Sequence, residues 1–214
     1  MSLRSLSVTL GPFATNAYVV TCEETLETAV LDVGFDAAEM ARRLKAAGFH
    51  VRYLLNTHAH YDHIAGMREL QELVGGTYWL HPGDRFLAES VVQQGAAFGL
   101  PEALAPDEIH DLADRQSLPL GTGALEVIHT PGHSPGSVTF RAGDSLWVGD
   151  VLFAGSIGRT DLPGGSFPVL RESIRERLFP LGDALRVLPG HGPETTIGHE
   201  RRTNPFVGDA AEAV

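Results

Sequence analysis

The chain has 214 residues, of which 43% are hydrophobic and 20% are charged, and its formal net charge is -11 at pH 7. This length predicts one domain, and the composition is that of a soluble globular protein. Proteins that bind nucleic acids normally carry a basic face, so the acidic balance argues against a nuclease or phosphodiesterase. Cys22 is the single cysteine, which excludes an internal disulfide bond.

The sequence contains neither the apolar core of a signal peptide nor a run approaching the roughly 20 apolar residues of a membrane helix. We therefore expect a cytoplasmic protein with a small-molecule substrate and no membrane or nucleic-acid partner. The oligomeric state is not indicated. We expect a single domain over residues 1–207 and a flexible acidic tail over residues 208–214.

In chain order, the first half alternates strand and helix patterns. Apolar periodicity and turn residues predict strands at 5–10, 16–21 and 28–32, a helix from 36 to 47, a strand at 51–56, a helix at 66–73 and a strand at 77–80. Residues 84–114 are interpreted as a helix followed by a loop.

The second half repeats this order without a repeat in sequence. Strands are expected at 124–129, 138–141 and 145–148, then a helix at 169–178, a strand at 186–188 and a closing helix near Glu200. Two central sheets with helices outside would bury both sets of apolar strands. We therefore predict an α/β (α+β) fold, arranged as a four-layered αββα sandwich with polar loops at one edge.

Four potential metal ligands fall within six residues, directly after the expected strand at 51–56: His58, His60, Asp62 and His63. A helix would direct residues two apart to different faces, so we expect a tight loop that turns all four side chains into one small volume. Imidazole and carboxylate ligands together suit zinc, iron or manganese.

Three further candidates lie beside glycines at the ends of expected strands: His133, Asp150 and His191. Glycine permits the sharp turns and close backbone approach that a metal cluster needs. Five histidines and two carboxylates would serve two metal ions, with one carboxylate shared. The other histidines are assigned to structure or surface: His50, His81, His110, His129 and His199. Asp32 is interpreted as a turn cap, with a contact that orients a ligand histidine as the alternative.

In order and approximate spacing, these motifs resemble those of the metallo-β-lactamase superfamily. Four further segments make the chain similar to the short glyoxalase II-like hydrolases: 149–153, 158–161, 189–193 and 200–206. The resemblance implies the metallo-β-lactamase fold and two zinc ions, with iron or manganese as alternatives. It implies one ion held by His58, His60 and His133, the other by Asp62, His63 and His191, and Asp150 between them.

The same resemblance implies hydrolysis of a glutathione thioester, such as S-D-lactoylglutathione, by a hydroxide that bridges the two zinc ions. Asp62 and Asp150 are then the expected catalytic carboxylates. The long glyoxalase II form has a lysine and a tyrosine where this chain has Arg159 and Asp161. Arg159 is expected to bind a substrate carboxylate, and an equal alternative is a structural pair with Asp161.

Two other enzymes and a non-catalytic module remain as alternatives. A mononuclear iron persulfide dioxygenase would use His58, His133 and Asp150 as its ligands. In the best-known subclass of β-lactamases a cysteine ligand stands near the position of Asp150, which argues against that activity. A non-catalytic binding module would be expected to have lost ligands, and none is lost.

Overall fold

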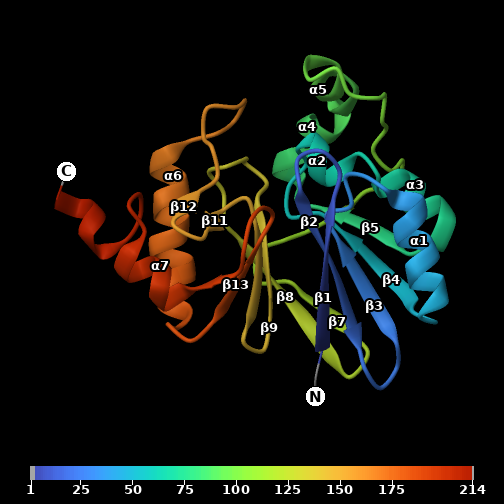
Figure 1. The fold of residues 1–214 in the computed structure, drawn as a ribbon, viewed down its shortest axis with the longest axis horizontal. Coiled ribbons are helices and arrows are strands. Elements are labelled where there is room, and N and C mark those ends of the chain that lie inside the picture. The colour runs from blue at the N-terminus through green and yellow to red at the C-terminus, as the bar shows by residue number, and fades with distance from the viewer. Residues whose placement is uncertain (1–2, 214) are drawn as a thin grey trace.

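The computed structural model describes residues 3–213, which form two central sheets with helices on both outer sides (Figure 1). The first sheet has the strand order β1 (Leu3–Leu10), β2 (Thr15–Cys22), β3 (Glu27–Leu31), β4 (His50–Leu55), β5 (Thr77–Leu80) and β6 (His110–Asp111). The second has the order β14 (Thr195–Thr196), β13 (Arg186–Pro189), β10 (Ser145–Gly149), β9 (Val138–Ala142), β8 (Gly123–His129) and β7 (Ser117–Leu120). A small hairpin pairs β11 (Leu152–Phe153) with β12 (Ser156–Ile157).

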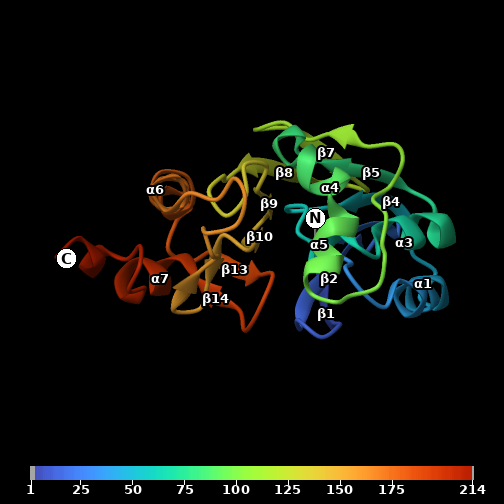
Figure 2. The same ribbon diagram turned by 90° about the horizontal axis from the view of Figure 1, so that it is seen from above.

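The helices divide between the two sheets and one edge of the sandwich (Figures 1 and 2). The first sheet is covered by α1 (Ala37–Ala46) and α3 (Met67–Val74). The edge carries α2 (Tyr61–Ile64), η1 (Pro82–Asp84), α4 (Arg85–Glu89) and α5 (Val91–Ala97). The second sheet is covered by α6 (Phe167–Glu172), which continues as one π-helical turn η2 (Ser173–Leu178), then by η3 (Phe179–Leu181) and α7 (Ile197–Thr203).

Three apolar layers hold the four structural layers together, because neighbouring residues of a strand point to opposite faces. On β2, Val19 packs outward under α1 and α3, whereas Val20 packs inward between the sheets. On β10, Leu146 packs outward under α6, whereas Trp147 packs inward. The predicted αββα sandwich is confirmed.

The structure differs from the expectations in detail. The segment 58–63 is a loop only as far as His60, and from Tyr61 onward it forms the short helix α2. Five short strands were not predicted: β6, β7, β11, β12 and β14. Residues 209–213 form a short 3-10 helix, η4 (Asp209–Ala213), the flexibility expected for residues 208–214 stays a prediction, and residue 214 lies outside the described residues. None of the helices in the described part of the chain is long and apolar enough to span a membrane.

Candidate metal centre

Four chain segments bring the expected ligands to the same edge of the sandwich. The segment after β4 supplies His58 and His60 from a loop, and Asp62 and His63 from α2. The other three follow strands of the second sheet: His133 after β8, Asp150 after β10 and His191 after β13. All seven side chains singled out in the sequence therefore meet in one place.

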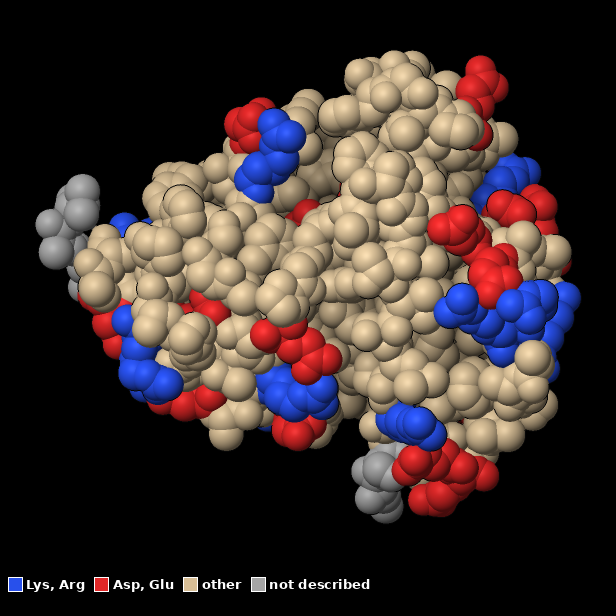
Figure 3. All heavy atoms as spheres, viewed as in Figure 1, with Lys and Arg blue, Asp and Glu red and all other residues tan. Residues whose placement is uncertain are grey.

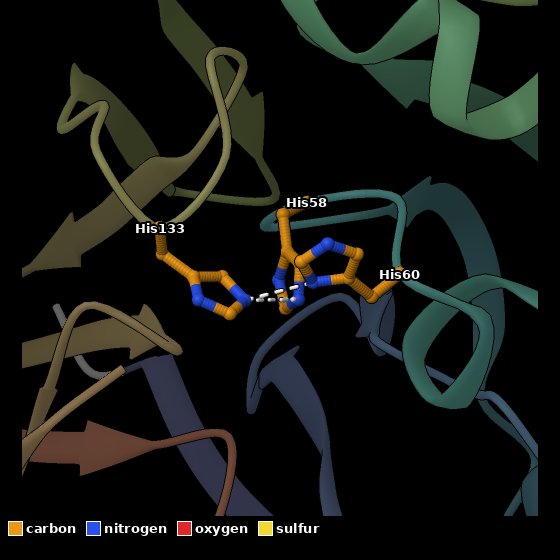
Figure 4. A group of neighbouring side chains, drawn as sticks. All are labelled: His58, His60 and His133. Atoms are coloured by element: carbon orange, nitrogen blue, oxygen red, sulfur yellow. Dashed lines mark hydrogen bonds between the residues drawn. The ribbon is translucent and has the colours of Figure 1, made fainter. Parts of the chain in front are cut away.

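His58, His60 and His133 form the first group (Figure 4). The Nε2 atom of His133 lies 2.8 Å from His60 Nδ1 and 3.2 Å from His58 Nε2. Two nitrogens that share a tetrahedral zinc ion at about 2.0–2.1 Å lie roughly 3.3 Å apart. The three ring nitrogens thus converge at the spacing that a metal ion requires.

Asp62, His63 and His191 form the second group. The Oδ2 atom of Asp62 lies 3.0 Å from His191 Nε2 and 3.4 Å from His63 Nε2. Asp150 faces both groups, because its carboxylate oxygens lie 3.7 Å from His133 Nε2, 3.4 Å from His63 Nε2 and 3.5 Å from His191 Nε2. His58, His63 and Asp150 form a further group of potential ligands, so the two groups adjoin each other through shared residues.

Oxygen atoms on the far side of the cluster fix the orientation of two rings. The Nδ1 atom of His133 lies 2.7 Å from the carbonyl oxygen of Arg159, and Nδ1 of His191 lies 3.1 Å from the carbonyl oxygen of Phe13. A proton on Nδ1 is the donor in each contact, because a carbonyl oxygen only accepts. In each ring, Nε2 is therefore unprotonated and its lone pair is available to bind a metal ion.

Asp32 supports one histidine of each group, so the interpretation as a turn cap was wrong. Its Oδ2 atom accepts a hydrogen bond from Thr57 Oγ1 (2.6 Å), and Thr57 Oγ1 in turn lies 3.1 Å from His58 Nδ1. The same Oδ2 lies 3.2 Å from Nδ1 of His63. Asp32 is 1% exposed, and the backbone amide of Thr57 donates to its second oxygen (2.8 Å). The alternative of an orienting residue is confirmed.

Asp84 is a positioning residue that sequence reasoning missed. Its buried carboxylate accepts hydrogen bonds from the backbone amides of Ala59 (3.0 Å) and Gly136 (2.6 Å) and from Ser134 Oγ (2.7 Å). Burial raises the pKa of Asp84, although these donors act in the opposite direction. Because Ala59 lies between His58 and His60, Asp84 joins the ligand loop of the first sheet to that of the second.

Glycine is required where backbone approaches the cluster. A Cβ atom on Gly190 would collide with Asp150 Oδ1 and His63 Cε1. One on Gly158 would collide with the carbonyl oxygen of Asp150. Any larger residue at either position would push Asp150 away from its place between the two groups.

The histidines of the cluster shift in opposite directions. Burial would lower the pKa of His63 and His191, but the neighbouring carboxylates of Asp62 and Asp150 outweigh it and raise the pKa of both. Burial, reinforced by the neighbouring histidines, lowers the pKa of His58 well below its usual value and that of His60 to about 3. Burial opposes ionisation of Asp62 and Asp150, but the adjacent histidines outweigh it and lower the pKa of both carboxyl groups. Neutral imidazoles and carboxylates are the forms in which these side chains bind metals.

The side chains that are present fit a metal ion. Among the described residues, most of the buried side-chain polar atoms without a hydrogen-bond partner belong to the cluster: His60 Nε2, both ring nitrogens of His63, and Asp150 Oδ1. A buried polar atom left unpaired costs about 1–3 kcal/mol. A cation held between His63 Nε2 and Asp150 Oδ1 would remove that cost for these two atoms and would also balance the two carboxylates. The other two atoms lie on the ring edges of His60 and His63 that do not form the ligand groups.

A cavity of about 220 Å³ opens over the cluster. Asp62, Asp150, His60, His133 and His191 line its floor, and the walls are formed by Phe13, Tyr61, Gln94, Phe98, Arg159 and Leu162. The predicted substrate cation, Arg159, is thus at the cavity. Asp161 binds one edge of the Arg159 guanidinium bidentately, with Nε–Oδ1 and Nη2–Oδ2 distances of 2.7 Å.

The remaining histidines lie outside the cluster. His81 stacks on His129 with ring centroids 4.1 Å apart, and His110 stacks on Trp79 at 4.8 Å. None of the five occurs in a group of potential ligands among residues 3–213. The expectation that they serve structure or surface is consistent with these positions.

The fold, the histidine and carboxylate cluster and the comparisons with known proteins together define a metal-dependent hydrolase. The family model of the metallo-beta-lactamase superfamily matches residues 10–191, and the chain belongs to this superfamily. The hydroxyacylglutathione hydrolase GloC of Haemophilus influenzae is 37% identical over 190 residues, which are 86% of this chain and 89% of that protein.

Two solved structures are similarly close. TTHA1623, solved in a di-iron-bound form, is 39% identical with a TM-score of 0.87, and the match covers 94% of this chain and 99% of that one. BLEG-1, described as a B3 metallo-beta-lactamase, is 38% identical with a TM-score of 0.87, over 95% of this chain and 99% of that one.

Proposed function

We propose that this protein is a thioester hydrolase of the glyoxalase II type that works with two metal ions, zinc in the first instance. The observation that carries the proposal is that the seven side chains form two three-residue groups with Asp150 facing both. The relative named as a hydroxyacylglutathione hydrolase and the relative solved with two irons support it. A glutathione thioester such as S-D-lactoylglutathione is the first substrate to assay.

In this proposal, His58, His60 and His133 hold one ion, Asp62, His63 and His191 hold the other, and Asp150 binds both. When bound, two such ions lower the pKa of a water molecule and polarise a substrate carbonyl. The protein contributes the orientation of the ligands, through Asp32, Asp84 and the backbone carbonyls. It also contributes a cavity that holds the carbonyl over the cluster.

The cavity supplies no free acid to protonate a leaving group. Apart from the proposed ligands and Arg159, its titratable side chain is Tyr61, whose hydroxyl donates to the carbonyl oxygen of Pro101 (2.6 Å). Burial raises the pKa of that hydroxyl. A thiolate, with a thiol pKa of about 8.5, leaves without such help, whereas an amine does not. This favours a thioester over an amide.

β-Lactam hydrolysis is a second candidate, because one close structural relative is described as a B3 metallo-beta-lactamase. The sequence argument against β-lactamase activity, a missing cysteine ligand, applies only to the best-known subclass of these enzymes. A persulfide dioxygenase would need only His58, His133 and Asp150. It would leave the second complete group, Asp62, His63 and His191, without a role.

The decisive experiment strips the protein with a chelator, reloads it separately with zinc, iron or manganese, and measures bound metal and turnover on the same samples. We expect about two ions per chain and hydrolysis of S-D-lactoylglutathione. Oxygen uptake with glutathione persulfide at about one iron per chain would establish the dioxygenase instead. Turnover of a chromogenic cephalosporin without thioester hydrolysis would establish the lactamase.

A further inference from the structure

An apolar wall stands beside the reacting centre. Phe13, Phe98 and Leu162 line the cavity over the cluster. The rings of Phe13 and Phe98 meet edge to face with centroids 5.9 Å apart. These side chains are 41% and 58% exposed, so they present apolar surface to solvent at the point where a substrate enters. Exposed apolar surface that is concentrated at a binding cleft commonly marks an interaction site.

The wall is anchored to the ligand loop. The ring of Phe13 packs on that of Phe35 with centroids 6.2 Å apart, and the ring of Phe35 packs on that of Tyr61 with centroids 5.8 Å apart. Phe98 directly follows α5, and this helix is tied down by Gln94, whose side-chain oxygen accepts from the amide of Tyr61 (3.0 Å). The two rings are therefore held at a fixed place relative to the neighbouring residue Asp62.

The cavity offers little cationic side-chain surface. Arg159 is the only Lys or Arg side chain among the described residues that line the cavity, and Asp161 occupies one edge of its guanidinium through Nε and Nη2. Only the Nη1 side of the guanidinium is left for a substrate carboxylate. In the space-filling view the surface over α5 is largely uncharged (Figure 3). An apolar group needs no cation for its binding.

We propose that Phe13, Phe98 and Leu162 form a subsite for an uncharged apolar acyl group, so that the preferred substrates are thioesters with an apolar acyl group. This rests on the proposed thioester hydrolysis and specifies its substrate class. The acyl group would lie against the two rings while its carbonyl reaches the cluster. The thiol portion would point out of the cavity.

The test compares phenylacetyl and acetyl thioesters of one uncharged thiol, N-acetylcysteamine, in the metal-loaded protein. Within each variant, the ratio of the two kcat/KM values cancels metal content and enzyme concentration. Burial of an aromatic ring stabilises a complex enough to change kcat/KM by about tenfold or more. We expect the ratio to fall by about this factor in Phe98→Ala and in Phe13→Ala. Phe206→Ala, which removes a 46% exposed phenylalanine outside the cavity, should leave the ratio unchanged.

An equal loss on both thioesters, or the same change of ratio in Phe206→Ala, would overturn the subsite. If the parent protein hydrolyses S-D-lactoylglutathione but neither of these two thioesters, the subsite is overturned and the proposed function stands. If it hydrolyses none of the three, the proposed function fails, and the subsite is judged by calorimetric binding of S-benzylglutathione and S-methylglutathione. These thioethers differ only in the apolar group. About tenfold tighter binding of the benzyl compound, lost in Phe98→Ala, would support the subsite, and equal binding would overturn it.

Discussion

Replacement of Asp84 by alanine tests whether a buried carboxylate outside the cluster positions the ligands. The substitution leaves three buried donors without their acceptor: the amides of Ala59 and Gly136 and the hydroxyl of Ser134. Each hydrogen bond to a charged group contributes about 1.5–3 kcal/mol. The sum is an upper bound, because Ser134 Oγ also lies 2.7 Å from Ser137 Oγ and the desolvation of the carboxylate is removed together with the bonds.

We expect the free energy of unfolding to fall by about 3–5 kcal/mol, the range for removing one partner of a buried charged network. In a chain of this size that lowers the melting temperature by roughly 6–20 °C. Asp84→Asn retains one oxygen for two of the donors but turns an amide nitrogen toward the amide of Gly136. It should therefore cost less, about 1–3 kcal/mol.

Two readouts separate stability from positioning: thermal unfolding of the metal-free protein, and metal affinity by competition with a chelator. Loss of a group that orients ligands typically weakens metal binding by about 10–100-fold. Asp107→Ala is the matched control, because that carboxylate is 81% exposed and pairs only at the surface, with Arg68. A decrease of less than about 1 kcal/mol in the free energy of unfolding, or metal binding as tight as in the parent protein, would refute the positioning role.

Three further substitutions test the proposed centre. Asp150→Ala should lower the metal content of both sites, as measured by elemental analysis, and should abolish turnover. His110→Ala is the control and should retain two ions. Full metal occupancy in Asp150→Ala would remove Asp150 from the ligand set. Asp32→Asn should weaken metal binding by about 10–100-fold with the cluster residues intact, and unchanged binding in competition titrations would contradict its orienting role. Arg159→Gln should keep its metal, because His133 contacts only the backbone carbonyl of that residue, and should change the melting temperature little, because exposed ion pairs contribute about 0–1 kcal/mol. A loss of metal in Arg159→Gln would show that the side chain supports the loop.

The fold was predictable where periodicity extended over several residues. Short apolar segments between turn residues predicted β2, β4 and β10, and the helical pattern of residues 36–47 predicted α1. Four of the missed strands, β6, β11, β12 and β14, are two residues long, which is too short for any period to show. The fifth, β7, contains Pro119, and proline usually argues against a strand.

The ligands were recognisable because four of them lie within six residues, but their support was not. Asp84 follows Pro82 and Gly83, a pattern that indicates a turn before a helix. Its side chain instead contacts residues 25 and 50 or more positions away, and spacing along the chain carries no record of such contacts. The Arg159–Asp161 pair was considered from the sequence, but only the structure could show that the contact is bidentate, through Nε and Nη2.

Each proposed ligand group takes members from both sheets, and this has a consequence for how the chain acquires metal during synthesis. The first group lacks a ligand until His133 has been made, and the second lacks one until His191 has been made, close to the end of the 214 residues. A nascent N-terminal half would present His58, His60, Asp62 and His63 without the partners that complete either group. If the proposed centre binds metal, both ligand groups are complete only late in synthesis, and a bound ion would then link the two halves of the chain after both have folded.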